Sequence, residues 1–220
     1  SDKQELISIE HLVDQRFIKS HTIDQAIFLN NDKYVFNVAI TSEIQSIIDK
    51  MKNDVLPLNS FFDITRGVNP YDVYTGQTRE VIDSKAYHSS VKKDDTFVPE
   101  LRGKHIKRYF YQWDGKHYIS YGPWLAAPRD VRFFKGQRIL FREILGKRFE
   151  CTFIEEDFII DRSLYIALIK NEMVEIIDIK YLLGILCSKL LPFYFRYISN
   201  EFDELFPKIR LAEFKLLPIK

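Results

Sequence analysis

The stretch "QRILFREILGKRFECTFIEEDFIIDRSLYIALI", residues 137–169, consists largely of β-branched, aromatic and leucine residues broken by one acidic run. Such residues favour pleated, half-buried strands. The first nine residues alternate in character, and a strand would place Arg138, Leu140 and Arg142 on one face. We therefore expect this stretch to supply the central strands of the fold.

The acidic run Glu155-Glu156-Asp157 separates two further strand-like segments, "FECTFI" and "FIIDRSLYIALI". A short polar run between two apolar segments is typical of a turn between paired strands. We expect residues 149–154 and 158–169 to form an antiparallel hairpin around it.

The hydrophobic period changes after Asp178, which stands at an N-cap position. The segment that follows, "IKYLLGILCSKLLPFYFRYIS", is apolar nearly all round, as expected of a helix sunk in a core. Pro192 would clash with the carbonyl four residues earlier, which predicts a kink or a break there. The closing segment, "FPKIRLAEFKLLPIK", is predicted to be a strand with a polar end.

The N-terminal part gives three local signals. Residues 1–40 alternate apolar and polar in short runs, such as "AIFL" and "YVFNVAI" around the turn signal "NNDK", which predicts a hairpin or a pair of strands. Ser42 and Gln45 have the spacing of a capping box and begin a helix with apolar residues at helical spacing up to Met51. Glycine and proline punctuate residues 65–82, "TRGVNPYDVYTGQTREVI", which predicts an irregular loop able to present side chains to a ligand.

These segments predict an α+β fold, a curved and mainly antiparallel sheet packed by one long apolar C-terminal helix. With 220 residues, 46% of them hydrophobic, the chain can bury a sizeable core without disulfides. Cys151 and Cys187 are far apart in sequence without metal-ligand spacing, which indicates a reducing compartment. The longest apolar run is interrupted by charged residues and a proline, so we expect a cytoplasmic protein without a membrane span.

The net charge of +1 conceals a strong segmentation. Residues 99–150 hold twelve Lys and Arg against five Asp and Glu, a balance of +7, whereas residues 151–178 carry −5. The basic segment also contains the aromatic run Tyr109 to Trp113. A surface that grips DNA needs cations for phosphate oxygens and planar groups that pack on sugars or bases. A strand with one buried aromatic face and one solvated face gives the same composition, so both interpretations stay open at this point.

Two enzymatic interpretations of the sequence compete with structural ones. Asn69-Pro70-Tyr71 approaches the adenine methyltransferase signature, in which an Asn or Asp precedes two prolines and an aromatic residue, but one proline is missing. No glycine-rich loop follows a strand to hold a cofactor. A turn fixed by Pro70 is the favoured interpretation, and no catalytic residue is predicted.

The second enzymatic interpretation is a metal-dependent nuclease. Asp161, Asp178 and Lys180 follow the order of the PD-(D/E)xK type, with Glu143 or Glu150 as an additional ligand for Mg²⁺. A helix cap explains Asp178 better, and no metal site is predicted. This nuclease and a protein-interaction module with solvated charge remain the alternatives to DNA binding.

Five phrases of the sequence follow one another in the order of a known family. They are "FFDITRGVNPY", "FVPELRGKHIKRYFYQWDGK", "GQRILFREILGKRF", "YLLGILCSKLLPFYF" and "FPKIRLAEFKLLPI". In this order they resemble the TaqI-like C-terminal specificity domain of restriction-modification methyltransferases, over about residues 42–220. Cys187 departs from the family pattern, where an Asn is more usual, and this departure concerns helix packing rather than DNA contact.

The resemblance implies a target recognition domain at residues 42–220, with residues 1–41 as a connector from an upstream methyltransferase domain of the same polypeptide. This chain would bind double-stranded DNA and read its sequence without catalysing a reaction. The catalytic domain would hold S-adenosylmethionine and methylate adenine, as in type IIG-like enzymes. Whether the parent enzyme also carries an endonuclease domain stays open.

The candidate DNA contacts combine the irregular loop with the basic segment. In the loop, Arg66 can pair bidentately with guanine and Asn69 with adenine, although a phosphate contact and a turn cap explain them equally well. The candidate DNA-binding residues are Arg66, Asn69, Arg102, Lys104, Lys107, Arg108, Arg142, Lys147 and Arg148.

Overall fold

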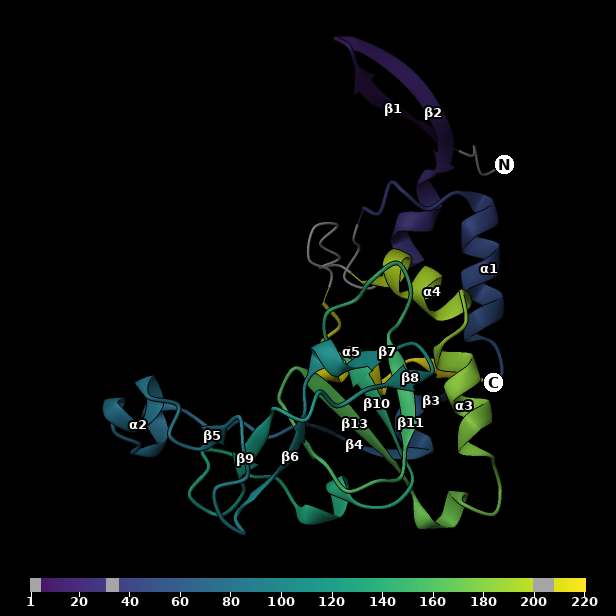
Figure 1. Cartoon of the computed structure of the whole chain (residues 1–220). Helices are drawn as coiled ribbons and strands as arrows, with labels where there is room; N and C mark the ends of the chain where they lie inside the picture. The colour runs from purple at the N-terminus through teal and green to yellow at the C-terminus, as the bar shows by residue number, and fades with distance from the viewer. Residues whose placement is uncertain (1–4, 31–35, 200–207) are drawn as a thin grey trace. The chain divides into compact units, whose positions relative to one another are not determined.

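The computed structural model describes residues 5–30, 36–199 and 208–220. The chain divides into two compact units (Figure 1). The small unit comprises residues 1–55 and 193–202, and the large unit comprises residues 56–192 and 203–220. The large unit therefore contains every candidate DNA-binding residue.

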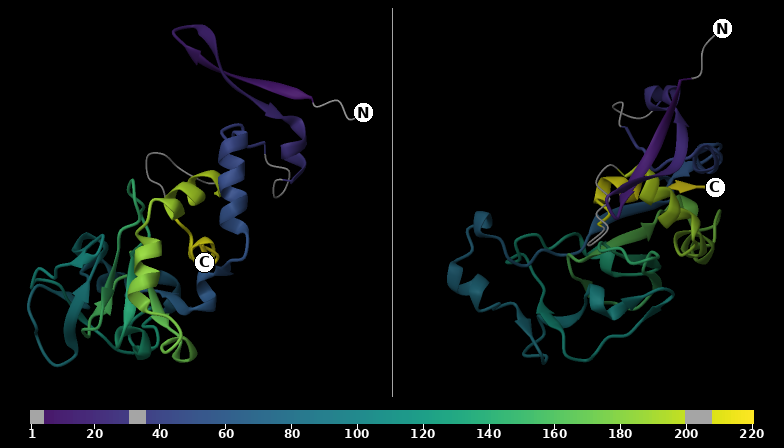
Figure 2. Two further views of the ribbon diagram at one scale, coloured as in Figure 1. Left: turned by 90° about the vertical axis from the view of Figure 1, so that its right-hand side faces the viewer. Right: turned by 90° about the horizontal axis from the view of Figure 1, so that it is seen from above.

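The small unit begins with an antiparallel hairpin of β1 (Leu6–Val13) and β2 (Arg16–Asp24). The hairpin is a single twisted ribbon in each view (Figure 1, Figure 2). Its two turn residues, Asp14 and Gln15, have φ values of +48° and +64°. Positive φ at both central positions is the turn geometry that matches the twist of the flanking strands.

The hairpin expected within residues 1–40 is confirmed, but it lies at residues 6–24 and not around the turn signal "NNDK". Gln25–Asn30 form a 3₁₀ helix, while residues 31–35 lie outside the described residues. The Asp24 carboxylate accepts from the Ala26 N–H at 2.9 Å, which starts a turn where a strand was expected.

The predicted helix α1 (Ser42–Lys52) is confirmed, but its N-cap lies one residue earlier than expected. The Thr41 hydroxyl accepts from the Ile44 N–H at 3.4 Å. Ile48 is the buried residue of α1 and packs in a small core with Ile40 and with Tyr194 of α4 (Leu190–Ile198). The narrow apolar stripe of α1 thus gives the small unit its own core.

The main sheet of the large unit has the strand order β11 (Cys151–Ile154), β10 (Arg138–Arg142), β13 (Leu164–Ile169) and β4 (Phe62–Arg66). All neighbours are antiparallel. The strands expected within residues 137–169 are confirmed. Because β10 lies between β11 and β13, the hairpin expected across the acidic run is wrong.

A second sheet explains why that hairpin does not form. Its order is β12 (Ile159–Ile160), β6 (Phe97–Leu101), β9 (Tyr118–Ser120) and β5 (His88–Ser89), with β12 parallel to β6. The chain leaves the main sheet after β11, adds β12 to the second sheet, and returns as β13. The acidic run is therefore a crossing between sheets rather than a hairpin turn.

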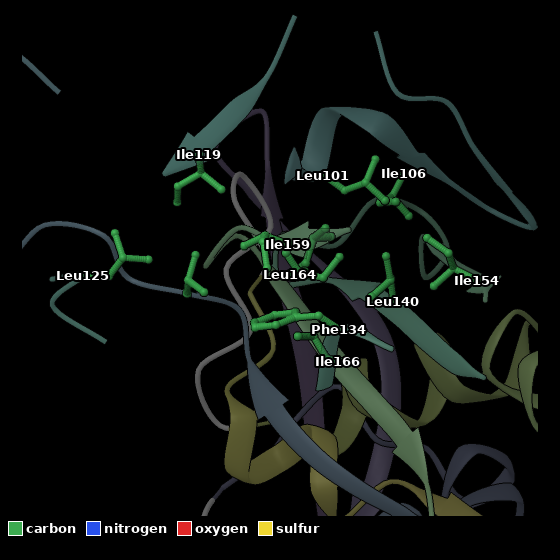
Figure 3. Close-up of a cluster of buried hydrophobic side chains, with 12 residues drawn as sticks. Leu101, Ile106, Ile119, Leu125, Phe134, Leu140, Ile154, Ile159, Leu164 and Ile166 are labelled. Atoms are coloured by element: carbon green, nitrogen blue, oxygen red, sulfur yellow. The ribbon is translucent and has the colours of Figure 1, made fainter. Parts of the chain in front are cut away.

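The core of the large unit is shared by both sheets. Leu140 and Ile166 of the main sheet and Leu101 and Ile119 of the second sheet belong to one buried cluster (Figure 3). Burying such side chains contributes about 1.5–3 kcal/mol each. This shared core holds together the edges of the two sheets from which the candidate site is built.

Arg138 is a buried member of the basic segment. Its Nη1 and Nη2 donate to the carbonyls of Gly136 and Glu156 at 2.7 and 2.6 Å. Burial lowers its pKa to about 10, so it stays protonated at neutral pH. The charge count over residues 99–150 therefore includes at least one cation that DNA cannot reach.

The prediction of a single long apolar helix is wrong, because α3 (Ile179–Leu186) and α4 are separate helices. Asp178 caps α3 as expected, accepting from the Lys180 N–H at 2.7 Å. Pro192 stands in the first turn of α4, where its missing N–H is tolerated. The helix breaks just before Pro192, at residues 187–189. This gap includes Ser188, four residues earlier, whose carbonyl would clash with the proline ring in a continuous helix.

Short elements complete the large unit. They are β3 (Leu56–Pro57), α2 (Arg79–Asp83), β7 (Ile106–Lys107), β8 (Phe110–Tyr111), α5 (Leu211–Lys215) and β14 (Pro218–Ile219). The strand expected at the end of the sequence is replaced by α5, whose start is capped by Glu213 accepting from the Arg210 N–H at 2.8 Å. Within the described part of this segment, residues 208–220, β14 is the named strand, and it pairs antiparallel with β3.

The fold is thus mixed α and β with mainly antiparallel strands, as expected, but the strands are divided among several small sheets. Cys187, at the end of α3, lies with its Sγ 3.1 Å from that of Cys151 on β11, so it contributes to the packing of α3 on the main sheet. Among the described residues, no helix has the length and apolar character needed to cross a membrane.

We predict that Gly67→Ala destabilises the large unit by roughly 2–3 kcal/mol in urea unfolding. A Cβ at Gly67 would lie 2.3 Å from the backbone oxygens of Ile160 and Asp161, which cannot move aside cheaply. The matched control is Gly184→Ala in α3, where a Cβ meets nothing within 4 Å and should add about 0.5–1 kcal/mol of stability. Equal stability of the two variants would contradict the close approach.

Candidate nucleic-acid interface

The turn Asp161–Ser163, between β12 and β13, organises its own backbone. The Asp161 carboxylate accepts from the Ser163 N–H at 2.9 Å, which closes the turn. The Asp161 N–H donates to the carbonyl of Leu101 at 2.9 Å and so continues the pairing with β6. The turn therefore has a fixed backbone from which Arg162 projects.

Two glycine-containing loops lie against this turn from different sides. Gly67 N–H donates to the carbonyl of Leu164 at 3.0 Å, and Val68 N–H donates to that of Ile160 at 2.8 Å. From the other loop, Gly103 N–H donates to the Ser163 hydroxyl at 2.9 Å. The phrases "TRGVNPY" and "LRGKH", distant in sequence, are thus joined through the turn.

Arg66, at the end of β4, has its guanidinium directed toward protein acceptors. Nε donates to the carbonyl of Arg162 at 2.7 Å, and Nη2 forms an ion pair with Glu143. The Nε–Nη2 side of the fork, one of the edges that pairs bidentately with a base, is therefore occupied. The structure brings Arg66 to the turn but gives it an internal partner.

Arg162 is exposed, and its Nη1 donates to the Asn69 side-chain oxygen at 3.2 Å. Asn69 is fixed through its backbone, which exchanges two hydrogen bonds with Ala127 at 3.0 and 2.7 Å. The two side chains come from separate segments and lie side by side. The structure therefore pairs Asn69 with Arg162 rather than with Arg66.

Two more arginines surround the turn. Arg129 is exposed, and its Nε donates to the carbonyls of Arg66 and Gly67 at 3.1 and 3.3 Å. Arg142, on β10, also extends to this turn. A Cβ added to Gly103 would lie 3.2 Å from the Ser163 hydroxyl and 3.8 Å from the Arg142 Nε. We call Arg66, Arg129, Arg142 and Arg162 the arginine cluster. With Glu143 and Asp161 as the neighbouring acids, this small area carries excess positive charge that suits a polyanion.

The second basic region, residues 104–111, directly follows Gly103. Lys104 pairs with Asp114 at 3.0 Å, while Lys107 is exposed on β7. The exposed Arg108 guanidinium lies 5.2 Å from the ring centre of Tyr109, which is itself 52% exposed. Tyr111, by contrast, packs against the core cluster. The aromatic run is therefore divided between core and surface, and its contact with DNA stays a prediction.

The remaining candidates divide between interior and surface. Arg102 Nε donates at 2.5 Å to Glu100, whose side chain is fully buried. A buried carboxylate needs such a partner, so this guanidinium stabilises the interior. Lys147 is exposed and Arg148 half-buried, both in the connection between β10 and β11. Among the described residues, neither is hydrogen-bonded to the arginine cluster.

His105, Asp114 and His117 have side-chain ligand atoms within 4.8 Å of one another. The hydrogen bonding nevertheless disfavours a metal site. His105 Nδ1 accepts from the Arg102 N–H at 3.0 Å, so the ring proton is on Nε2, which faces Asp114 at 3.2 Å. A ligating histidine has the opposite arrangement, with a lone pair toward the metal and a proton on the other nitrogen.

The group is instead a polar network that ties two turns together. His117 Nδ1 lies 2.7 Å from Asp114, and this hydrogen bond is the main cause that lowers the pKa of the Asp114 carboxyl. Burial is the main cause that lowers the pKa of His105. The network fixes residues 103–105, which connect the turn Asp161–Ser163 to the second basic region.

The nuclease candidates do not share a site. Asp161 caps its turn and Asp178 caps α3. The six residues of β13, about 20 Å of extended chain, lie between the two positions. The Lys180 ammonium is 5.5 Å from the ring centre of Phe153, away from Asp161. The arrangement does not bring together the carboxylates that the nuclease hypothesis requires.

Sequence reasoning missed Arg129 and Arg162. Arg162 lies in the segment 151–178, whose net charge of −5 hides a single arginine at a turn. Its signal is position, because "DRS" stands between two apolar strand segments. Arg129 lies within the basic segment, but its φ of +67° and its contacts depend on tertiary structure.

We predict that His105→Gln flattens the pH dependence of stability below about pH 6.5. Because the folded-state pKa of His105 is lowered, the unfolded chain binds the proton first, and stability is lost as pH falls. The wild type should lose up to about 1.4 kcal/mol per pH unit from this group, and the variant should not. Urea unfolding at several pH values between 5 and 7 measures the difference, and equally steep curves would contradict it.

Residues 98–219 match the family model described as the TaqI-like C-terminal specificity domain. The matched residues begin within β6 and end within β14. They include Arg129, Arg142 and Arg162, whereas Arg66 and Asn69 precede them. No curated protein sequence matches the chain.

Proposed function

Because the chain belongs to the TaqI-like C-terminal specificity domain family, we propose that it binds duplex DNA and reads the target sequence for a restriction-modification enzyme. The observation that carries this proposal is the arginine cluster. Four guanidinium groups from four segments meet around one fixed turn, with two acids beside them. A polyanion partner compensates the repulsion among such cations.

The proposed division of labour follows from the two kinds of contact that DNA needs. Phosphate contacts set register and orientation, and only base-edge contacts carry sequence. The exposed cations of residues 104–108 suit the phosphate backbone, because long side chains at the surface approach any sequence equally well. The arginine cluster, with its fixed backbone, suits base edges.

In this proposal the chain performs no chemistry. An upstream methyltransferase domain of the same polypeptide holds S-adenosylmethionine and methylates adenine, as in type IIG enzymes, in the cytoplasm. Residues 1–41 connect that domain to the recognition domain at residues 42–220. The sequence supports this division through its lack of a cofactor loop and of a complete base-holding motif.

We predict that the chain binds duplex DNA with a strong dependence on salt, and that Lys104→Gln with Lys107→Gln lowers the slope of log affinity against log salt by about two. Fluorescence anisotropy at several salt concentrations measures this slope. The matched control replaces Lys50 and Lys52, both exposed on α1 in the small unit, with glutamine. An equal change in both double variants would show only a general effect of charge.

We also expect calorimetry to detect no stoichiometric binding of S-adenosylmethionine to this chain, with or without duplex DNA. The physical reason is that no glycine-rich loop follows a strand to cradle the cofactor. Stoichiometric binding would assign a cofactor site to the recognition domain itself and would overturn the proposed division of labour.

A further inference from the structure

We propose that Arg162 and Asn69 together form a base-edge binding site for guanine in the major groove, and that Arg66 is a positioning residue for this site. The inference rests on the proposed function, since it assumes that the chain binds duplex DNA. It differs from both hypotheses that the sequence left open for Arg66, a guanine contact and a phosphate contact.

The two arginines differ in the edge that the protein occupies. Arg66 uses Nε for the carbonyl of Arg162 and Nη2 for Glu143. Arg162 uses only Nη1, for Asn69, among the hydrogen bonds of the described residues. The Nε–Nη2 edge of Arg162 is therefore available, and two parallel N–H groups match the N7 and O6 acceptors of guanine.

The backbone of Arg162 is preorganised for such a contact. Its carbonyl accepts from Arg66 Nε, its preceding residue is bonded to Leu101, and Ser163 is bonded to both Asp161 and Gly103. The Glu143 N–H also donates to the Ser163 carbonyl at 3.1 Å. A side chain on a backbone fixed in this way loses less entropy on binding, which favours specificity over loose attraction.

Asn69 orients the guanidinium. Its side-chain oxygen accepts from Arg162 Nη1, and its backbone is paired with Ala127 in both directions. The close approach of Gly67 to the turn brings Asn69 within hydrogen-bonding distance of Arg162. Only a residue without a Cβ fits at position 67. One asparagine and one arginine from separate loops thus act as a single reading unit.

The ion pair with Glu143 explains why Arg66 is a positioning residue and not a second residue that contacts a base. Its side chain is 18% exposed, and its charge is offset by Arg66. Removing Arg66 would leave this carboxylate without its partner and beside the turn Asp161–Ser163, where it would attract the guanidinium of Arg162 away from the base. Arg66 therefore keeps Arg162 directed outward by satisfying Glu143 and by bonding the turn.

The test is selection from a library of duplexes with a randomised segment, using the full 220-residue chain. The wild type should prefer guanine at one position, and Arg162→Ala should lower that preference roughly ten- to hundredfold. Arg162→Lys keeps the charge but not the fork, so it should lose the same preference while keeping the salt slope. Arg79→Ala, which removes an exposed arginine of α2, is the matched control and should change nothing.

A positioning role for Arg66 has its own readout. Arg66→Ala should broaden the preference at the same position as Arg162→Ala, and the double variant should broaden it no further. A purely structural role would instead lower affinity for all sequences with the pattern unchanged. Thermal unfolding of each variant identifies any that fail to fold, and Arg162→Lys preserves the test in that case.

Three outcomes would overturn the inference. Unchanged guanine preference in both Arg162 variants would place this arginine away from the bases. Loss of a preference for adenine, instead of guanine, in the Arg162 variants would indicate that Asn69 contacts the base, and would remove the guanine assignment. If the wild type binds DNA without any sequence preference, this site reads nothing, although DNA binding stands. A wild type that binds no duplex at all would overturn the proposed function itself.

Discussion

The close approach of Gly67 to the backbone of Ile160 and Asp161 is the constraint on which the rest of the large unit depends. It brings β4 of the main sheet beside β12 of the second sheet, so two small sheets share one core. The same approach fixes the turn Asp161–Ser163 between two loops that are distant in sequence. Rigidity of the fold and geometry of the candidate interface therefore have one cause.

The cations of the large unit have three different roles, which a count of charges does not separate. Arg138 satisfies backbone carbonyls in the interior, and Arg102 compensates a buried glutamate. Lys104 belongs to a polar network with Asp114, while Lys107 and Arg108 are exposed. Lys104, Lys107 and Arg108 are all exposed and, with the arginine cluster, accessible to a polyanion. The turn that carries Arg162 in the cluster is fixed by hydrogen bonds.

The sequence predicted local features well, because they depend on neighbouring residues. The helix at residues 42–52, the cap at Asp178 and the strands within residues 137–169 follow from spacing and composition. The pairing of these strands was not predictable from the acidic run, because β12 pairs with β6, far earlier in the chain. Ile159 lies beside Glu100, 59 residues before it. The same limit applies to the site, since Arg162 acquires its neighbours Asn69 and Arg66 only through that crossing.

The pairing of β3 with β14 has a consequence for how such a domain can be inherited. Leu56, the first residue of the large unit, is paired with Ile219, which lies next to the last residue of that unit. A folded segment whose two ends lie together can be transferred into another polypeptide with little disturbance at the junctions. Recombination at this strand pair would move every candidate DNA-binding residue in one step, and Tyr194 of the small-unit core with them.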